Sequence, residues 1–391
     1  MRNSGWNFIL TTFVLSRLFF FGVGFVAAAF LPWVVPWEER SIAPDPALEG
    51  FWGLWTHWDG LIYIAIAAQG YEANDPERPA FFPLFPMLIR AGLALGVPID
   101  LWGVLISLVA TFCALYFVYR IAEKHWGQMV ARAAVLTFAF FPTAFFLNAV
   151  YTEALFVAFA AGSYWAAYVR RDLFLAGLLG ALAAATRNTG VLLLIPLVYL
   201  WLRNRSEFGW RGLWQLALVP AGLLGYMILL WYKFGDPLIF ANAQTSWGRE
   251  LTNPLATLEK AWTSAAEGLK VVLDPATLFL EQSAVPSLEA SNAVNLIFLV
   301  LFLVLMGIGF AILPPGLSVY TFLVTLLPVL TPALGLPLMS LPRFILGGFP
   351  LFFVLGYLLS YSRLALSLWL LVSASLGTVL TALFVTWRWV A

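Results

Sequence analysis

Charged residues are scarce in this sequence. Only 10% of its 391 residues are Asp, Glu, Lys or Arg, whereas a typical soluble domain contains roughly 25%. The few charges nearly cancel, because 21 basic residues stand against 20 acidic ones. So little charge cannot cover the surface of a water-soluble globule, and a balanced chain presents no long-range field to nucleic acid. The composition therefore excludes a cytosolic enzyme, a nucleic-acid-binding protein and a disordered chain.

Residues that commonly bind metals are also scarce. The chain has one cysteine, Cys113, and two histidines, His57 and His125. One cysteine excludes an internal disulfide and a cysteine-rich metal site, and two histidines are too few for a histidine cluster. No Asp-x-Asp motif lies near Asp59, the acidic residue considered below. The sequence therefore predicts no definite cofactor and does not support a divalent metal.

Apolar residues, in contrast, make up 62% of the chain, and its mean hydropathy is +0.89. A helix needs roughly 20 apolar residues to cross a bilayer. We therefore predict an all-α polytopic membrane protein, with residues 1–391 forming one integral membrane domain and no internal repeat. The apolar runs predict about eleven transmembrane helices, at 8–30, 101–121, 130–147, 153–169, 173–185, 190–202, 213–232, 294–313, 317–333, 344–361 and 364–387.

The distribution of charge along these segments predicts the orientation of the protein. Lys and Arg cluster in alternate short loops, which marks those loops as cytoplasmic. The long loops at 31–100 and 233–293 then lie outside, as do all acidic residues except Glu123, Asp172 and Glu207. We predict an uncleaved first span, a cytoplasmic N-terminus and an outer C-terminus. Two short apolar pieces of the first outer loop, 61–68 and 80–96, predict amphipathic or re-entrant segments at the interface.

One pair of predicted spans, 173–185 and 190–202, is unusually short. At 1.5 Å per residue each arm extends about 20 Å, whereas the hydrocarbon core is about 30 Å thick. Arg187, at the tip, should therefore remain within the outer leaflet. A charged side chain at that depth is costly unless it is paired or hydrated. We expect either a water-filled cavity that reaches Arg187 or a structural ion pair with Glu153 or Asp59.

The first candidate for chemistry is Asp59, which lies in the string His57-Trp58-Asp59-Gly60 where the chain re-enters apolar sequence. A carboxylate at this position can accept a proton from a hydroxyl group, and general base catalysis contributes roughly 10²–10⁴-fold to a rate. It can also bind a cation. The structural alternative is that Asp59 caps the helix that begins at Gly60.

Further candidates lie on the same predicted side of the membrane. Glu153 begins a helix, where the helix dipole alone favours a carboxylate, but it can also line a polar cavity and pair with an arginine. Lys233-Phe234-Gly235-Asp236-Pro237 is also a common turn, and Arg343 can reach the interface by snorkelling. Charged groups that collect around a cavity in an apolar shell are functional candidates. The outer side collects six of them: Asp59, Glu153, Arg187, Lys233, Asp236 and Arg343.

Several strings together resemble the PIG-V family of mannosyltransferases, and especially its bacterial relatives. They occur in the order found in that family and cover about residues 57–350. The strings are His57-Trp58-Asp59-Gly60 with Tyr63 and Gly70-Tyr71, Ala80-Phe81-Phe82-Pro83-Leu84-Phe85-Pro86, Tyr151-Thr152-Glu153-Ala154-Leu155-Phe156, Ala185-Thr186-Arg187, and Pro342-Arg343-Phe344.

The resemblance implies a GT-C type glycosyltransferase in a bacterial cytoplasmic membrane. Such enzymes take a sugar, here expected to be mannose, from a polyprenyl phosphate donor and transfer it with inversion to a lipid or glycan acceptor. By resemblance, Asp59 is the general base. Charge and side of the membrane suggest Arg187, Arg343, Lys233 and His57 for the donor phosphate. The full set of predicted substrate-binding residues is His57, Trp58, Tyr63, Glu153, Arg187, Lys233, Asp236 and Arg343.

The sequence leaves two alternatives open. A lipid-linked sugar flippase or transporter without catalysis would also need charged groups in a cavity, although transporters often contain internal repeats and broken helices at the midplane. Within the GT-C class, the donor sugar could be glucose, arabinose or an amino sugar instead of mannose. The acceptor cannot be identified from the sequence.

Overall fold

The computed structural model describes residues 2–34, 50–72 and 75–390. Within these ranges the chain forms helices joined by turns, and the only β-type pairing described is an isolated bridge between Ala333 and Leu336. The predicted all-α fold is therefore confirmed. The part of the predicted first outer loop at 35–49 lies outside the described residues.

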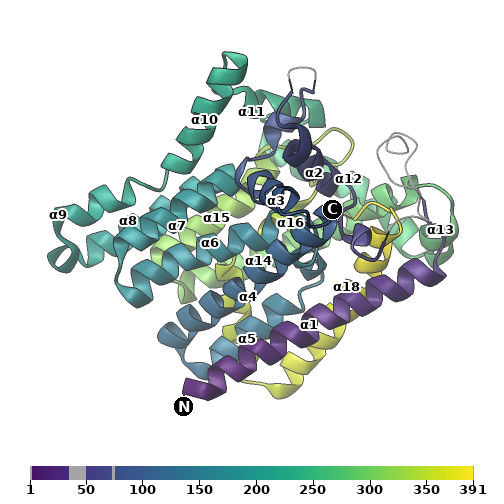
Figure 1. The fold of residues 1–391 in the computed structure, drawn as a ribbon. Helices are drawn as coiled ribbons and strands as arrows, with labels where there is room; N and C mark the ends of the chain where they lie inside the picture. The colour runs from purple at the N-terminus through teal and green to yellow at the C-terminus, as the bar shows by residue number, and fades with distance from the viewer. Residues whose placement is uncertain (1, 35–49, 73–74, 391) are drawn as a thin grey trace.

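Five helical stretches of the described chain are long and apolar enough to cross a membrane. They confirm a multi-pass membrane protein, whereas the count of eleven spans remains a prediction. Figure 1 shows α1 as a long diagonal helix beside α4, α5 and α18. The five stretches are α1 (Arg2–Phe30), α4 (Ile99–Trp126), α9 with α10 (Arg205–Leu216 and Ala221–Phe234), α14 (Val285–Ile312) and α18 (Arg363–Val385).

The other predicted spans contain shorter helices, and two of these spans are interrupted. The predicted span 130–147 ends as a helix at Ala139, because Pro142 cannot continue the helical hydrogen bonds. The predicted span 344–361 is divided into α16 (Leu341–Ile345) and α17 (Pro350–Ser360). The remaining shorter helices are α5 (Gln128–Ala139), α6 (Glu153–Trp165), α7 (Leu173–Thr186), α8 (Leu194–Arg203) and α15 (Pro315–Leu330).

The two long loops fold into short helices. The predicted interfacial segments form α2 (Asp59–Gln69) and α3 (Leu84–Ala94), each 11 residues long. The second long loop contains α11 (Ile239–Asn242), α12 (Pro254–Val272) and α13 (Pro275–Leu280). Figure 1 shows α2, α3 and α11 together at the end of the bundle opposite the N-terminus.

Buried Arg17 of α1 supports the interrupted helix α5. Its guanidinium donates to the Ala139 carbonyl at 2.8 Å and the Ala144 carbonyl at 2.9 Å, and to Asn148 Oδ1 at 2.6 Å. A carbonyl freed where a helix stops must find another donor when it is buried. Arg17 supplies these donors and fixes α1 against the irregular segment that leads to α6.

Close packing places the end of α7. A Cβ atom added to Gly222 of α10 would lie 1.9 Å from the carbonyl oxygen of Ala181 in α7. Only glycine permits two helix backbones to approach this closely, a common device in membrane helices. The contact fixes α7, whose last residue, Thr186, precedes Arg187.

Candidate active site

The centre of the site is an ion pair between Asp59 and Arg343. Arg343 Nη1 donates to Asp59 Oδ2 at 2.6 Å, and the two side chains are 8% and 15% exposed. Asp59 is the first residue of α2, and Arg343 lies in the short helix α16. Asp59 therefore does more than begin a helix, because its carboxylate pairs with Arg343. Arg343 is held in a buried ion pair, so snorkelling does not explain its position.

Both helices are entered through strained residues. Trp58, directly before Asp59, has a φ of 55°, and Ser340, three residues before Arg343, has a φ of 64°. Residues other than glycine rarely adopt this left-handed region, and such strain concentrates at functional sites. The strained backbone sets the direction in which each helix starts, and with it the direction of each charged side chain.

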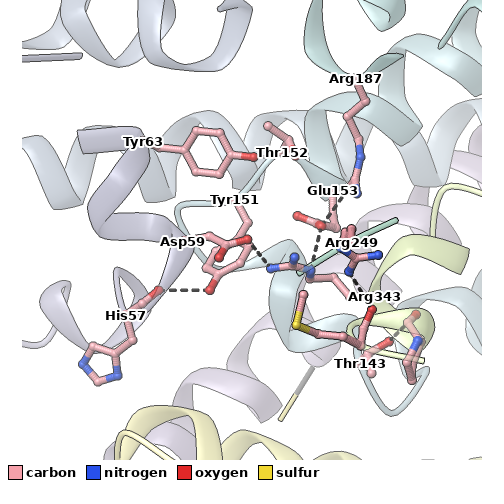
Figure 2. Close-up of polar contacts among 12 residues, drawn as sticks. His57, Asp59, Tyr63, Thr143, Tyr151, Thr152, Glu153, Arg187, Arg249 and Arg343 are labelled. Atoms are coloured by element: carbon pink, nitrogen blue, oxygen red, sulfur yellow. Dashed lines mark hydrogen bonds and ion pairs between the residues drawn. The ribbon is translucent and has the colours of Figure 1, made fainter. Parts of the chain in front are cut away.

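Glu153 extends the ion pair into a network of four charges. It begins α6 and is 2% exposed. Its Oε1 accepts from Arg187 Nη1 at 2.8 Å and lies 3.5 Å from Arg343 Nε. Figure 2 shows Glu153 between the two arginines, with Asp59 on the far side of Arg343. The predicted pairing of Arg187 with Glu153 is therefore present, and Glu153 has a larger role than helix-dipole stabilisation.

Arg249 is a third arginine at the site, and sequence reasoning missed it. It is buried and donates to the carbonyls of Thr331 at 3.2 Å and Met339 at 3.0 Å. Among the described residues, no carboxylate lies within ion-pair distance of it. Burial, followed by the neighbouring charge of Arg343, lowers the pKa of Arg249 to about 10, so it is charged at neutral pH. The available signal was a basic residue next to Trp247-Gly248 in the long loop at 233–293, which the sequence predicts to be outer.

These groups line a cavity of about 410 Å³ that reaches Arg187, as the short helical pair predicts. Three guanidinium groups and two carboxylates leave its wall with one excess positive charge. Aromatic rings cover much of the remainder. The charged lining is Asp59, Glu153, Arg187, Arg249 and Arg343, and the aromatic lining is Tyr63, Phe81, Phe82, Phe240, Trp247, Phe344 and Trp389.

Tyr63 supplies a neutral polar group to the cavity wall. Its hydroxyl lies 3.2 Å from Thr152 Oγ1. Burial, reinforced by Glu153, raises the pKa of Tyr63 well above its ordinary value. The phenol therefore stays protonated at neutral pH, so it can hydrogen-bond to a ligand but cannot act as a base.

Four predicted site residues lie outside the cavity wall. The His57 ring is buried, stacks on Trp387 at 3.9 Å and has Nδ1 3.0 Å from the Phe384 carbonyl. These contacts give His57 a structural role, whereas any substrate contact by it remains a prediction. The same holds for Trp58, which packs edge-on against Trp389, for Lys233, which donates to the Tyr71 carbonyl, and for half-buried Asp236, which accepts from the Leu238 amide.

A second, apolar hollow of about 130 Å³ lies next to the charged cavity. α15 separates the two, because Val324 and Leu327 face the charged cavity while Thr325 and Leu326 face the hollow. The hollow lies between α12, α14 and α15. Its lining is Pro254, Leu258, Leu299, Leu303, Met306, Phe322, Thr325, Leu326 and Val329.

The fold and the cavity together define a multi-pass helical membrane protein with a charged pocket among its helices. Residues 38–203 match the family model described as mannosyltransferase (PIG-V). The resemblance inferred from the motifs is therefore confirmed over this region, which contains Asp59, Glu153 and Arg187. Arg249 and Arg343 lie beyond it.

Curated relatives show the same partial similarity. The chain is 34% identical over 176 residues to GPI alpha-1,6-mannosyltransferase 2 of Mus musculus, covering 42% of this chain and 34% of that protein. It is 32% identical over 158 residues to the Homo sapiens protein of the same name, covering 38% of this chain and 31% of that protein. GPI mannosyltransferase 2 of Schizosaccharomyces pombe is 22% identical over 205 residues, 49% of this chain and 44% of the yeast protein. The similarity thus spans about a third of the mammalian relatives.

Among solved structures, the chain is similar to an oligosaccharyltransferase of Archaeoglobus fulgidus. The TM-score is 0.44 and the sequence identity is 14%, over 95% of this chain and 53% of the other.

Proposed function

We propose that this protein is a glycosyltransferase of the GT-C type that moves mannose from a polyprenyl phosphate donor to an acceptor hydroxyl group, with inversion. The observation that carries the proposal is the Asp59–Arg343 ion pair in the wall of a cavity with one excess positive charge. The similarity of residues 38–203 to PIG-V mannosyltransferases supports mannose as the sugar.

In the proposed reaction, the acceptor hydroxyl group lies against Asp59 on the side of the sugar opposite the phosphate. Its proton moves to the Asp59 carboxylate while its oxygen forms a bond to the anomeric carbon. The bond between that carbon and the phosphate oxygen breaks, and its electron pair stays on the phosphate. The products are the glycosylated acceptor with an inverted anomeric centre, polyprenyl phosphate and protonated Asp59.

The net charge of the cavity wall matches the charge of the phosphate both before and after transfer. A polyprenyl phosphate sugar is a phosphodiester with one negative charge, which balances the one excess positive charge of the wall. After transfer the phosphate carries close to two negative charges. Protonation of Asp59 removes one negative charge from the wall at the same step, so the excess rises to two. Cationic groups aimed at a developing charge are a common source of catalysis.

The arginines have different tasks in this proposal. Arg343 is already paired with Asp59 and orients it. Arg187, whose side chain is 20% exposed, and Arg249, which lacks a described carboxylate partner, are the groups that bind the donor phosphate. This assignment replaces Lys233 and His57 as leading candidates, because neither lines the cavity.

The isoprenoid chain of the donor would leave the cavity past α15 into the apolar hollow. The hollow is lined almost entirely by hydrocarbon. It lies on the face of the last turns of α15 that points away from the cavity. An apolar chain gains free energy by leaving water for such a surface. The acceptor would enter from the aqueous side, at the outer face of a membrane in which the N-terminus is cytoplasmic.

The decisive experiment offers the purified full-length protein a panel of polyprenyl phosphate sugars that carry mannose, glucose, arabinose or an amino sugar, together with membrane lipid and glycan extracts as acceptors. Products are identified by mass spectrometry. We expect transfer from the mannose donor in preference to the others. Vesicle assays of donor movement in the same samples test the transporter alternative. Movement of intact donor across the bilayer without any transfer would replace the enzyme proposal.

A further inference from the structure

Phe344 lies at the point where the three arginines of the cavity meet. The guanidinium carbons of Arg187, Arg343 and Arg249 lie over its ring, at 4.9, 5.0 and 5.2 Å from the ring centroid. Phe344 is only partly buried and lines the cavity itself. The motif Pro342-Arg343-Phe344 was part of the family resemblance, yet the proposed reaction assigns no task to the phenylalanine.

The three arginines come from separate parts of the fold. Arg187 follows α7, Arg249 lies in the loop after the short helix Ala243–Trp247, and Arg343 is in α16 beside Phe344. Three like charges brought together repel one another. Two of them are offset by carboxylates, since Arg343 pairs with Asp59 and Arg187 pairs with Glu153. The third, Arg249, is held by backbone carbonyls.

The Phe344 ring attracts the guanidinium groups without neutralising their charge, which a carboxylate cannot do. The face of an aromatic ring carries partial negative charge, and it attracts a guanidinium most strongly where water is excluded. Such a face reduces the repulsion among the three cations without neutralising them. A further carboxylate would remove the excess positive charge that an anionic ligand needs, whereas an aliphatic side chain would fill the space without attracting the arginines.

We propose that Phe344 is a positioning residue whose ring holds Arg187 and Arg249 together beside Arg343, so that these two arginines form one anion-binding site for the phosphate of a lipid-linked sugar. The proposal rests on the proposed function for the class of ligand, and it adds the residue that builds the site. It attributes the effect of Phe344 to the charge distribution of the ring. The size of the side chain alone would not produce that effect.

A fluorine series at position 344 separates charge distribution from size. Progressive fluorination of phenylalanine weakens the negative face of the ring and changes its shape little. Full-length protein in nanodiscs would carry Phe, monofluoro-, difluoro- or trifluoro-Phe at position 344. The probe is undecaprenyl phosphate, and undecaprenol is the uncharged control. We expect affinity for the phosphate to fall stepwise, by roughly tenfold at trifluoro-Phe, with unchanged affinity for undecaprenol.

The same series at Phe349 is the matched control. Phe349 is fully buried, and its ring packs against Tyr320 and Phe353 with no described cation over it. We expect no trend there. Phe344→Trp should retain phosphate binding and Phe344→Leu should lose it. A flat series at position 344, or normal phosphate binding by F344L, overturns the proposal.

The series also distinguishes this proposal from the proposed function. Phosphate binding that follows the fluorine series, in a protein that transfers no sugar from any donor, would retain the anion site and refute the glycosyltransferase. Active transfer combined with a flat series would retain the glycosyltransferase and refute the role of Phe344 in the anion site. In an active enzyme, fluorination should raise KM for the donor more than it lowers kcat, because the site already binds the phosphate before the reaction.

Discussion

Arg343 Nη1 lies 2.6 Å from Asp59 Oδ2, although 284 positions separate the two residues in the chain. The contact joins the first residue of α2 to the short helix α16 that precedes α17. The proposed base is therefore positioned by a residue from the opposite end of the sequence. Correct placement of Asp59 requires that the whole bundle has formed.

Replacement of Asp59 by asparagine tests its role as the base. The carboxamide keeps the size of the side chain but cannot take a proton from the acceptor. We expect D59N to bind the donor within a few-fold of the wild type and to lose roughly 10²–10⁴-fold in kcat. The measurement is turnover of polyprenyl phosphate mannose by purified protein. Glu267→Gln removes an exposed carboxylate paired with Lys270 and should leave turnover unchanged. Full activity of D59N would exclude Asp59 as the base.

The strained residue Ser340 gives a test of how Arg343 is positioned. Its φ of 64° is easily reached by glycine and poorly by β-branched residues. We expect S340G to keep stability and turnover within about twofold, whereas S340V should lose stability by about 1–3 kcal/mol and lower turnover. Thermal unfolding in detergent and kcat report the two effects. Equal behaviour of the glycine and valine variants would show that the left-handed backbone does not matter at this position.

The charged motifs of the site could be predicted from sequence because local rules identify them. Asp59, Glu153, Arg187 and Arg343 are charged residues next to apolar runs, where each charge is costly and therefore informative. The short helices α2 and α3 followed from the poor length and polarity of their segments. The same reasoning placed all four residues on one side, and the structure brings them into one network.

What sequence reasoning missed depends on contacts between distant segments. Arg249 lies in a loop, where an arginine is normal, and only folding buries it against the carbonyls of Thr331 and Met339. Lys233 has the same charge and a similar place in the sequence, but its amine turns to the Tyr71 carbonyl. The interruption after Ala139 has a local cause in Pro142, but sequence reasoning could not show that Arg17 of α1 binds the Ala139 and Ala144 carbonyls and so stabilises the interruption within the buried bundle.

The contact between α7 and α10 predicts opposite effects at two glycines of one helix. Gly222 leaves no space for a Cβ atom, which would lie 1.9 Å from the Ala181 carbonyl oxygen, whereas Gly225 has nothing within 4 Å. We expect G222A to force the helices apart, to lower stability by about 1–3 kcal/mol and to weaken donor binding through Arg187. G225A should be neutral or slightly stabilising, because alanine favours a helix. Thermal unfolding of both variants provides the test, and equal stability would contradict the close contact.

The lowered pKa of Arg249 predicts a loss of phosphate binding at high pH. Burial favours the neutral form of Arg249, and its pKa of about 10 means that it is charged at pH 8 and mostly neutral at pH 11. The lipid phosphate is already fully ionised above pH 8. Arg343 is also buried, but the Asp59 and Glu153 carboxylates raise its pKa above the ordinary value, so it keeps its charge.

Affinity for undecaprenyl phosphate should therefore fall about tenfold between pH 8 and pH 11 in the wild type. R249Q should bind more weakly at pH 8 and show little further change, whereas exposed Lys270→Gln should behave as the wild type. A decline of equal size in R249Q would assign the titration to another group.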